Sequence, residues 1–265
     1  MTRKYAILFV LLIGLLVAIN ASAQVGHIKN IVTSPHNLSV TGTGDKHAID
    51  ATSTQICIYC HKPHQSSKAL YQPPLWNHTL STTATYGIYS SPTFNALGTD
   101  IAELGGATLG TAVVSNLCLS CHDGTVGINS VYSGFSGTVT NPDGTTTPLT
   151  MPDFGSGPNV PVYAHGPKDF KRLHPINFSY DATLVAKAPS LVMPVANGSG
   201  PGGGLYTIPA TGTSGGYLPL YPSPGGSGPK MQCATCHDVH DDTTNQPFLR
   251  DTLNGSKLCL DCHGA

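Results

Sequence analysis

The sequence predicts a fold that is mostly coil, with short helices at four copies of one Cys-x-x-Cys-His motif and a few short strands. All eight cysteines fall within these four motifs. Thirty glycines and 21 prolines interrupt the 265 residues, and charged residues make up only 10% of them. Long regular helices and an ordinary aliphatic core are therefore not expected.

The four motifs predict covalent haem attachment. We number them along the chain as motif 1 (57–61), motif 2 (118–122), motif 3 (233–237) and motif 4 (259–263). Two thiols add to the haem vinyl groups, and the following histidine binds the iron. The attachment cysteines are Cys57, Cys60, Cys118, Cys121, Cys233, Cys236, Cys259 and Cys262, and the iron-binding histidines are His61, His122, His237 and His263. Four covalently bound haem c groups follow, and their stacked rings are expected to form the core.

Zinc binding and redox disulfide chemistry are the alternatives for Cys-x-x-Cys. A zinc site needs paired half-sites, and it does not require histidine directly after every second cysteine. A thioredoxin-like disulfide is expected once, within a βαβ pattern. Four motifs without exception favour haem.

The first 23 residues predict a signal peptide. Arg3 and Lys4 precede an apolar run over 6–19, and Ala21-Ser22-Ala23 fits a cleavage site. An uncleaved anchor is the alternative, although the run is short for a membrane span. The protein is expected to be secreted and extracellular or at the cell surface, with the periplasm as the alternative.

The chain divides into an N-terminal arm (24–56), a first haem-pair module (57–132), a loop-rich insertion (133–230) and a second haem-pair module (231–265). The modules resemble each other: Ser115-Asn-Leu-Cys-Leu-Ser-Cys-His and Ser256-Lys-Leu-Cys-Leu-Asp-Cys-His follow one pattern. This internal repeat predicts two copies of a two-haem unit.

A few local elements are predicted between the motifs. Ser115 is expected to cap a short helix carrying motif 2, and a brief helical turn is expected at 100–104. The Asn-Pro-Asp-Gly sequence within 135–150 predicts a hairpin, and Asp181 and Pro189 bound a predicted helix over 181–187.

The glycine- and proline-rich stretch 197–229 is expected to be an extended surface loop with no packed core of its own. Its Tyr206, Tyr217 and Tyr221 are candidates for stacking on haem, with ordinary loop aromatics as the alternative.

Eight histidines lie outside the motifs, and four irons each need a sixth ligand. His174 and His240 are the first candidates, His36 and His64 follow, and His78 is a close substitute. His27, His47 and His165 are expected not to be ligands. Ligation by Met151, Met193 or Met231 is not expected.

Two imidazoles on each iron leave no open position for a substrate, so such haems move electrons. The protein is therefore not expected to be an enzyme. A haem-dependent reductase, the alternative, needs an open iron position and nearby proton donors. Net charge is −1, or −3 without Arg3 and Lys4, and no basic cluster indicates nucleic-acid binding. After residue 23 no hydrophobic segment is long enough to cross a membrane.

Several strings together resemble the doubled Cys-x-x-Cys-His family of multihaem cytochromes c. They are Cys57-x-x-Cys-His-Lys-Pro-His64, Pro74-Leu-Trp-Asn-His78, the sequence 117–126 and His174-Pro-Ile-Asn. Tetrahaem content, the signal peptide, the histidine-bearing arm and the glycine-rich loops are also similar to subunits of extracellular cytochrome filaments. His47 and His165 depart from the pattern.

The filament resemblance implies a continuous haem stack, copies of the chain as partners, ligands shared between subunits and electron conduction to external acceptors. His36 is the position expected to reach the haem of an adjacent subunit. The alternative is a discrete periplasmic tetrahaem shuttle that docks with redox partner proteins.

Overall fold

The computed structural model describes about half of the chain. The described residues are 30–42, 54–61, 75–81, 86–87, 89–96, 113–123, 138–140, 146–148, 170–171, 173–196, 206–209, 217–222, 228–242, 245 and 247–264. The predicted signal peptide, the helical turn at 100–104 and four histidines lie outside these residues: His27, His47, His64 and His165.

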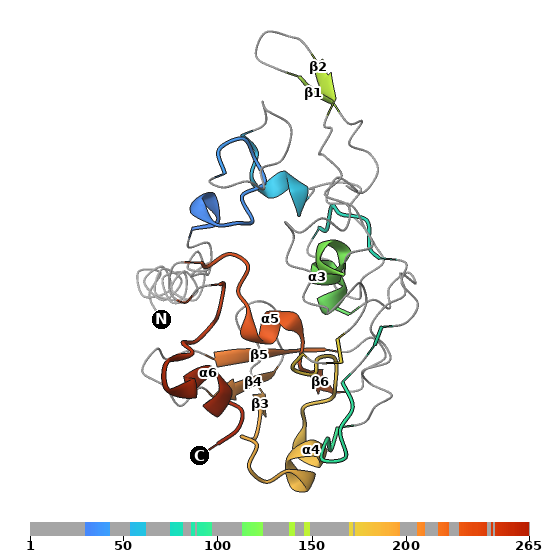
Figure 1. Cartoon of the computed structure of the whole chain (residues 1–265), viewed down its shortest axis with the longest axis vertical. Helices are drawn as coiled ribbons and strands as arrows, with labels where there is room; N and C mark the ends of the chain where they lie inside the picture. The colour runs from blue at the N-terminus through green and yellow to red at the C-terminus, as the bar shows by residue number, and fades with distance from the viewer. Residues whose placement is uncertain are drawn as a thin grey trace, which may run out of the picture.

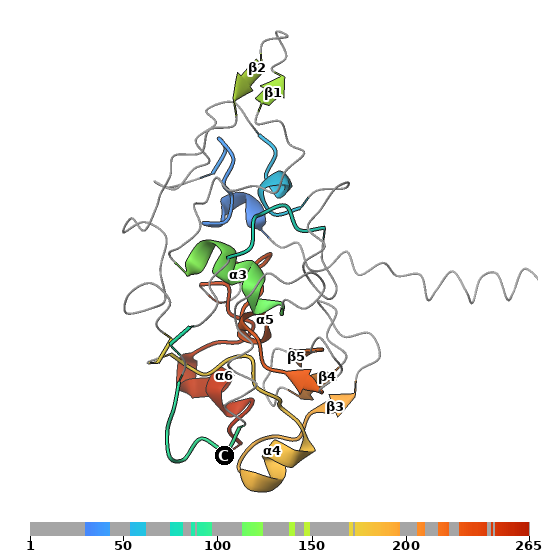
Figure 2. The ribbon, with the colours of Figure 1, turned by 90° about the vertical axis from the view of Figure 1, so that its right-hand side faces the viewer.

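Each motif begins in a short helix, as predicted. Motif 1 begins η3 (Cys57–Tyr59), motif 2 lies within α3 (Ser115–His122), motif 3 begins α5 (Cys233–Cys236), and motif 4 begins in α6 (Lys257–Leu260), directly after η5 (Asn254–Ser256). A further helical turn, η2 (Ile31–Thr33), precedes them. In both views these segments follow one another along the long axis in the order η3, α3, α5 and α6 (Figures 1 and 2). Among the described helices, none combines the length and apolar character that a membrane crossing requires.

Ser115 does not cap α3 as expected. The residue before the helix is Val114, which makes no side-chain cap. The Ser115 hydroxyl instead donates to Oε1 of Gln232 at 2.5 Å, next to motif 3. The Ser115 hydroxyl therefore binds a residue distant in the sequence and does not cap its own helix.

Two local predictions are confirmed. The hairpin is present as β1 (Thr138–Thr140) paired antiparallel with β2 (Thr146–Pro148). The helix is present as α4 (Ala182–Lys187), where Oδ1 of Asp181 accepts hydrogen bonds from the backbone N–H groups of Thr183 and Leu184. This is the usual way an aspartate satisfies the first turn of a helix.

The prediction of a loop over 197–229 is wrong in its central part. That stretch contributes to a four-stranded antiparallel sheet in the order β3 (Val195–Ala196), β4 (Tyr206–Pro209), β5 (Tyr217–Pro222) and β6 (Pro229–Lys230). Of the three tyrosines named for haem stacking, Tyr206 lies on the exposed side of β4, whereas Tyr221 is buried and its hydroxyl donates to the carbonyl of Ala234.

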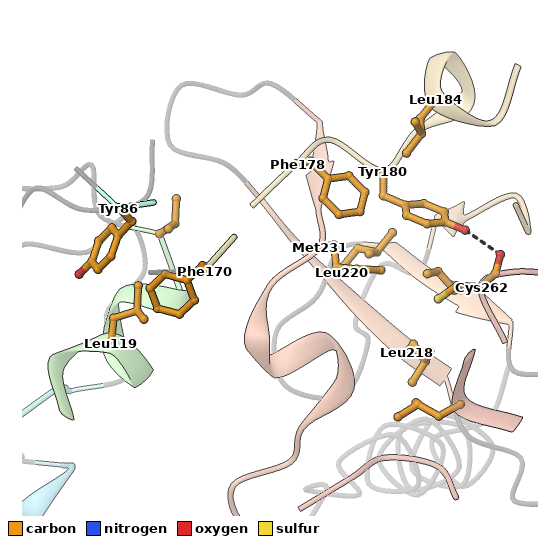
Figure 3. Close-up of a cluster of buried hydrophobic side chains, with 13 residues drawn as sticks. Tyr86, Leu119, Phe170, Phe178, Tyr180, Leu184, Leu218, Leu220, Met231 and Cys262 are labelled. Carbon is orange, nitrogen blue, oxygen red and sulfur yellow. Dashed lines mark hydrogen bonds between the residues drawn. The ribbon is translucent and has the colours of Figure 1, made fainter. Parts of the chain in front are cut away.

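An aliphatic and aromatic core, which composition did not predict, lies on this sheet. Ile208, Leu218 and Leu220 are at most 1% exposed, and they belong to one buried cluster with Tyr180 and Met231. In Figure 3, one part of the cluster lies beside the strands, and Tyr86, Leu119 and Phe170 lie together beside α3. Each fully buried leucine contributes about 1.5–3 kcal/mol, so the C-terminal part of the fold has a core made by protein side chains.

Candidate haem-binding sites

A single helical turn prepares each attachment motif. In motifs 1, 3 and 4 the backbone N–H of the histidine donates to the carbonyl of the first cysteine, at 2.8, 3.1 and 2.9 Å respectively. One turn brings residues three and four positions apart to the same side. Both thiols and the imidazole of a motif are therefore presented together.

Three motif histidines lie opposite a histidine from a distant part of the chain. The ring centroids are 6.0 Å apart for His61 and His240, 6.1 Å for His36 and His122, and 6.3 Å for His174 and His263. The angles between the ring planes are 26°, 55° and 76° in the same order. We call these the ring pairs of motifs 1, 2 and 4.

The spacing of the ring pairs fits an iron between two imidazoles. A metal–nitrogen bond of about 2 Å on each side of one ion separates the ring centroids by about 6 Å. A porphyrin supplies the other four nitrogens, so two protein nitrogens complete the coordination. Within the described residues, no group of three or more His, Cys, Asp or Glu side chains forms a metal cluster. Paired imidazoles and free thiols are the donor set that haem c uses.

Backbone carbonyls orient several of these imidazoles. Nδ1 of His174 donates to the carbonyl of Pro175 at 2.9 Å, and Nδ1 of His237 donates to that of Pro247 at 3.2 Å. Each bond fixes the ring so that Nε2 is left for a metal, as is common for histidine ligands. Burial lowers the pKa of both histidines. It also lowers the pKa of His36 to about 4, with His122 acting in the same direction. The neutral form is the one that binds metal.

Two predicted residues are placed differently. His36 lies beside His122 of its own chain, although it was expected to reach an adjacent subunit. His78 is buried, and its Nε2 lies 3.6 Å from Sγ of Cys121, beside an attachment thiol. No imidazole among the described residues lies opposite His237 of motif 3.

The thiols of successive motifs lie near enough to influence one another's pKa. Cys60 of motif 1 interacts electrostatically with Cys121 of motif 2, and Cys236 of motif 3 with Cys259 of motif 4. Between motifs 2 and 3, the Cys118 and Cys233 thiols influence each other, so that the pKa of the first is raised and that of the second is lowered. The order along the molecule is therefore 1, 2, 3, 4.

Burial keeps most attachment cysteines in the thiol form. It raises the pKa of Cys60 and Cys236 to about 11, and that of Cys121 and Cys262 to about 12. No disulfide joins the eight cysteines, all of which the structure describes. Every motif therefore presents two unpaired sulfurs for attachment.

A buried polar network, which the sequence did not reveal, joins motifs 2 and 3. The Ser115 hydroxyl donates to Gln232 and accepts from the backbone N–H of Cys233 at 3.0 Å. Nε2 of Gln232 then donates to Oδ1 of Asn177 at 2.7 Å. Ser115, Gln232 and Asn177 are at most 1% exposed. Since their partners are as far as 118 positions away, no local pattern indicates the network, although a serine and a glutamine next to attachment motifs are its one trace in the sequence.

Polar contacts also hold the ends of motifs 2 and 4. Asp123, directly after His122, is fully buried and accepts from the hydroxyls of Ser81 at 2.5 Å and Tyr86 at 2.9 Å. The carbonyl of Cys262 accepts from the Tyr180 hydroxyl at 3.3 Å (Figure 3). It also accepts from the N–H of Val192 at 2.9 Å. Polar contacts therefore hold motif 2 at both ends and motif 4 at its C-terminal end.

The C-terminal part of the chain matches a known family model. Residues 227–265, which contain motifs 3 and 4, match the family model of the doubled CXXCH motif. The search of curated proteins found no match. The doubled CXXCH motif indicates covalently bound haem c, and it supports a place for this chain among the multihaem c-type cytochromes, which transfer electrons.

Proposed function

We propose that this protein is an extracellular tetrahaem c-type cytochrome that carries electrons through closely spaced bis-histidine haems, as a subunit of a polymeric conductive filament. The observation that carries the proposal is the order of the four motif segments along the long axis of the fold (Figures 1 and 2), with thiols of successive motifs near enough to shift one another's pKa. Neighbouring haems attached to these thiols would be close enough for electrons to pass from each to the next.

The three ring pairs support electron transfer over catalysis. Bound haem would supply the redox chemistry, and at motifs 1, 2 and 4 the two histidines of each ring pair would hold its iron. With both positions filled, the iron has no site for a substrate. The protein is accordingly proposed to be a carrier and not an enzyme.

Exposed apolar side chains at both ends of the motif series support head-to-tail contact between copies. Val32 on η2 is 52% exposed, near the end that carries motif 1, and Val195 on the edge strand β3 is 44% exposed, near the other end (Figure 1). A head-to-tail contact between copies would bury both valines. A partner that repeats the chain would continue the line of haems.

Motif 3 is where we now propose that a ligand is shared, because the ring pair of His36 and His122 occupies one chain. The second imidazole for His237 would come from a histidine of a neighbouring copy of the chain. This replaces His36 in the role that the filament resemblance gave it.

Electron microscopy of the secreted protein tests the polymer. We expect filaments from the wild-type chain and separate particles from Val195→Lys, because a charge at the interface opposes burial. Thr93→Lys, which adds the same charge at an exposed polar position, should leave the filaments intact. Separate particles from the wild-type protein, with four low-spin haems, would favour the periplasmic shuttle instead.

A further inference from the structure

Phe248 lies face to face with His36, the distal member of the ring pair at motif 2. Their ring centroids are 4.4 Å apart, and the planes are tilted by only 18°. Phe248 is 7% exposed. A buried flat ring stacked on an imidazole limits how far that imidazole can turn about its own axis.

The backbone of Phe248 is held in a costly conformation. Its φ of +58° lies in the left-handed region, which bulky residues rarely adopt. Two hydrogen bonds maintain it: the N–H of Phe248 donates to Oδ1 of Asp242 at 3.0 Å, and its carbonyl accepts from the N–H of Asp238 at 2.7 Å. Strain kept in place by its surroundings is typical of positions where the direction of a side chain matters.

The same turn also contacts motif 3. The carbonyl of Pro247 accepts the hydrogen bond from Nδ1 of His237. Arg250 fastens the turn to α5, since its Nε donates to the carbonyl of Ala234 at 2.9 Å and its Nη1 to Oδ2 of Asp238 at 3.2 Å. The turn that carries Phe248 is therefore held against motif 3 by these hydrogen bonds.

We propose that Phe248 is a positioning residue that sets the plane of the His36 imidazole, and with it the electronic state of the iron at motif 2. The inference rests on the proposed function, in which His36 and His122 bind that iron. In low-spin ferric haem, the relative rotation of two axial imidazoles controls the splitting of the iron orbitals, so groups around a ligand tune the metal through its orientation. The 55° between His36 and His122 lies between the 26° and 76° of the other ring pairs.

Electron paramagnetic resonance of the ferric protein tests this, because principal g values report the rotation. His36→Ala is recorded first, and the low-spin signal that it converts to high spin belongs to motif 2. Phe248→Leu should then shift the largest g value of that signal and no other, while the iron stays low-spin. Phe248→Tyr, which retains the stacked ring, should restore the wild-type value.

Phe178→Leu is the matched control. Phe178 is as buried as Phe248, and its ring contacts are with Phe94 and Tyr180, so its loss should leave every g value in place. An unchanged motif 2 signal in Phe248→Leu, or an equal shift in Phe178→Leu, overturns the inference. If Phe248→Leu does not fold, Phe248→Met replaces it, because the flexible methionine side chain fills a similar space. Phe248→Met should shift the same g value of the motif 2 signal. If His36→Ala removes no low-spin signal, the ligand assignment in the proposed function fails, and the role of Phe248 fails with it.

Discussion

Histidines far apart in the sequence meet in pairs across the fold. Each ring pair joins a motif histidine to one outside the motifs, at centroid distances between 6.0 and 6.3 Å. At His174 a carbonyl also holds Nδ1, which leaves Nε2 directed away from the backbone. This residue therefore offers a direct test of the pairing.

Replacing His174 by alanine should convert one low-spin haem to high spin, because the iron bound by His263 loses its second imidazole. The visible spectrum and electron paramagnetic resonance of the ferric protein measure the change. Added imidazole should bind in the vacated space and return the low-spin spectrum. Four low-spin haems in the variant without imidazole would contradict the pairing of His174 with His263.

Sequence reasoning named all members of the ring pairs but could not pair them. His174 stood out because Pro175 restrains the chain beside it, and His240 because it follows motif 3 at the spacing that His64 has after motif 1. The filament resemblance implied that His36 reaches the haem of an adjacent subunit, and no local sign in the sequence placed it beside His122 of its own chain. Pairing of this kind depends on contacts across the whole chain, which leave no periodic trace in one sequence.

At the scale of elements, helices and turns that depend on nearby residues were predicted from the sequence. The sheet, which depends on contacts between distant residues, was not. Asp181 and the Asn-Pro-Asp-Gly turn act within a few residues, so α4 and the β1–β2 hairpin were found. The sheet was missed because prolines in 217–222 argue against a strand. Pro219 pairs with Thr207 on β4, whereas β6 reaches only Tyr221 and Pro222. On that side, proline at 219 therefore interrupts no ladder.

The contact between α3 and α5 depends on Ser115. Ser115→Ala should lower the free energy of unfolding by about 1–3 kcal/mol, because the backbone N–H of Cys233 is left buried without its acceptor. Guanidinium unfolding of the haem-loaded protein, followed by far-ultraviolet circular dichroism, measures this loss.

Thr207→Val provides the control for Ser115→Ala. The Thr207 hydroxyl is buried in β4 and has no hydrogen-bond partner in the described part of the chain. Replacing it with a methyl group removes a polar atom that burial disfavours, so stability should stay the same or rise slightly. Equal losses in the two variants would show that the Ser115 contact has no special importance.

At the scale of the whole molecule, buried protein side chains are concentrated around the C-terminal sheet, and few of them lie near motif 1. The large buried cluster includes the strands of the C-terminal sheet, whereas Tyr59 and Leu80, near motif 1, each lie in a small cluster of their own. A core formed only by stacked haems, as the sequence predicted, would leave a chain without haem largely unfolded. Because the sheet has its own core, we expect that part of the chain to fold without haem and the part near motif 1 to need haem.

A variant with all eight cysteines changed to alanine should keep structure around β4 and β5 and lose it around 54–61 and 75–81. The first region buries Ile208, Leu218 and Leu220 against other side chains, and such burial does not require haem. Hydrogen exchange measured by mass spectrometry should find slow exchange in the sheet and fast exchange near motif 1, with the haem-loaded protein as reference. Uniformly fast exchange would mean that haem is needed for the whole fold.

The two histidines of each ring pair lie far apart in the sequence, so they are synthesised at different times. A chain made from its N-terminus has both His36 and His122 once residue 122 has been added, so the pair of motif 2 is complete early. His61 of motif 1 is made sooner than His122, yet it waits for His240. A chain stopped between residues 122 and 240 would therefore have both histidines of the ring pair of motif 2, but only one of the two that form the ring pair of motif 1.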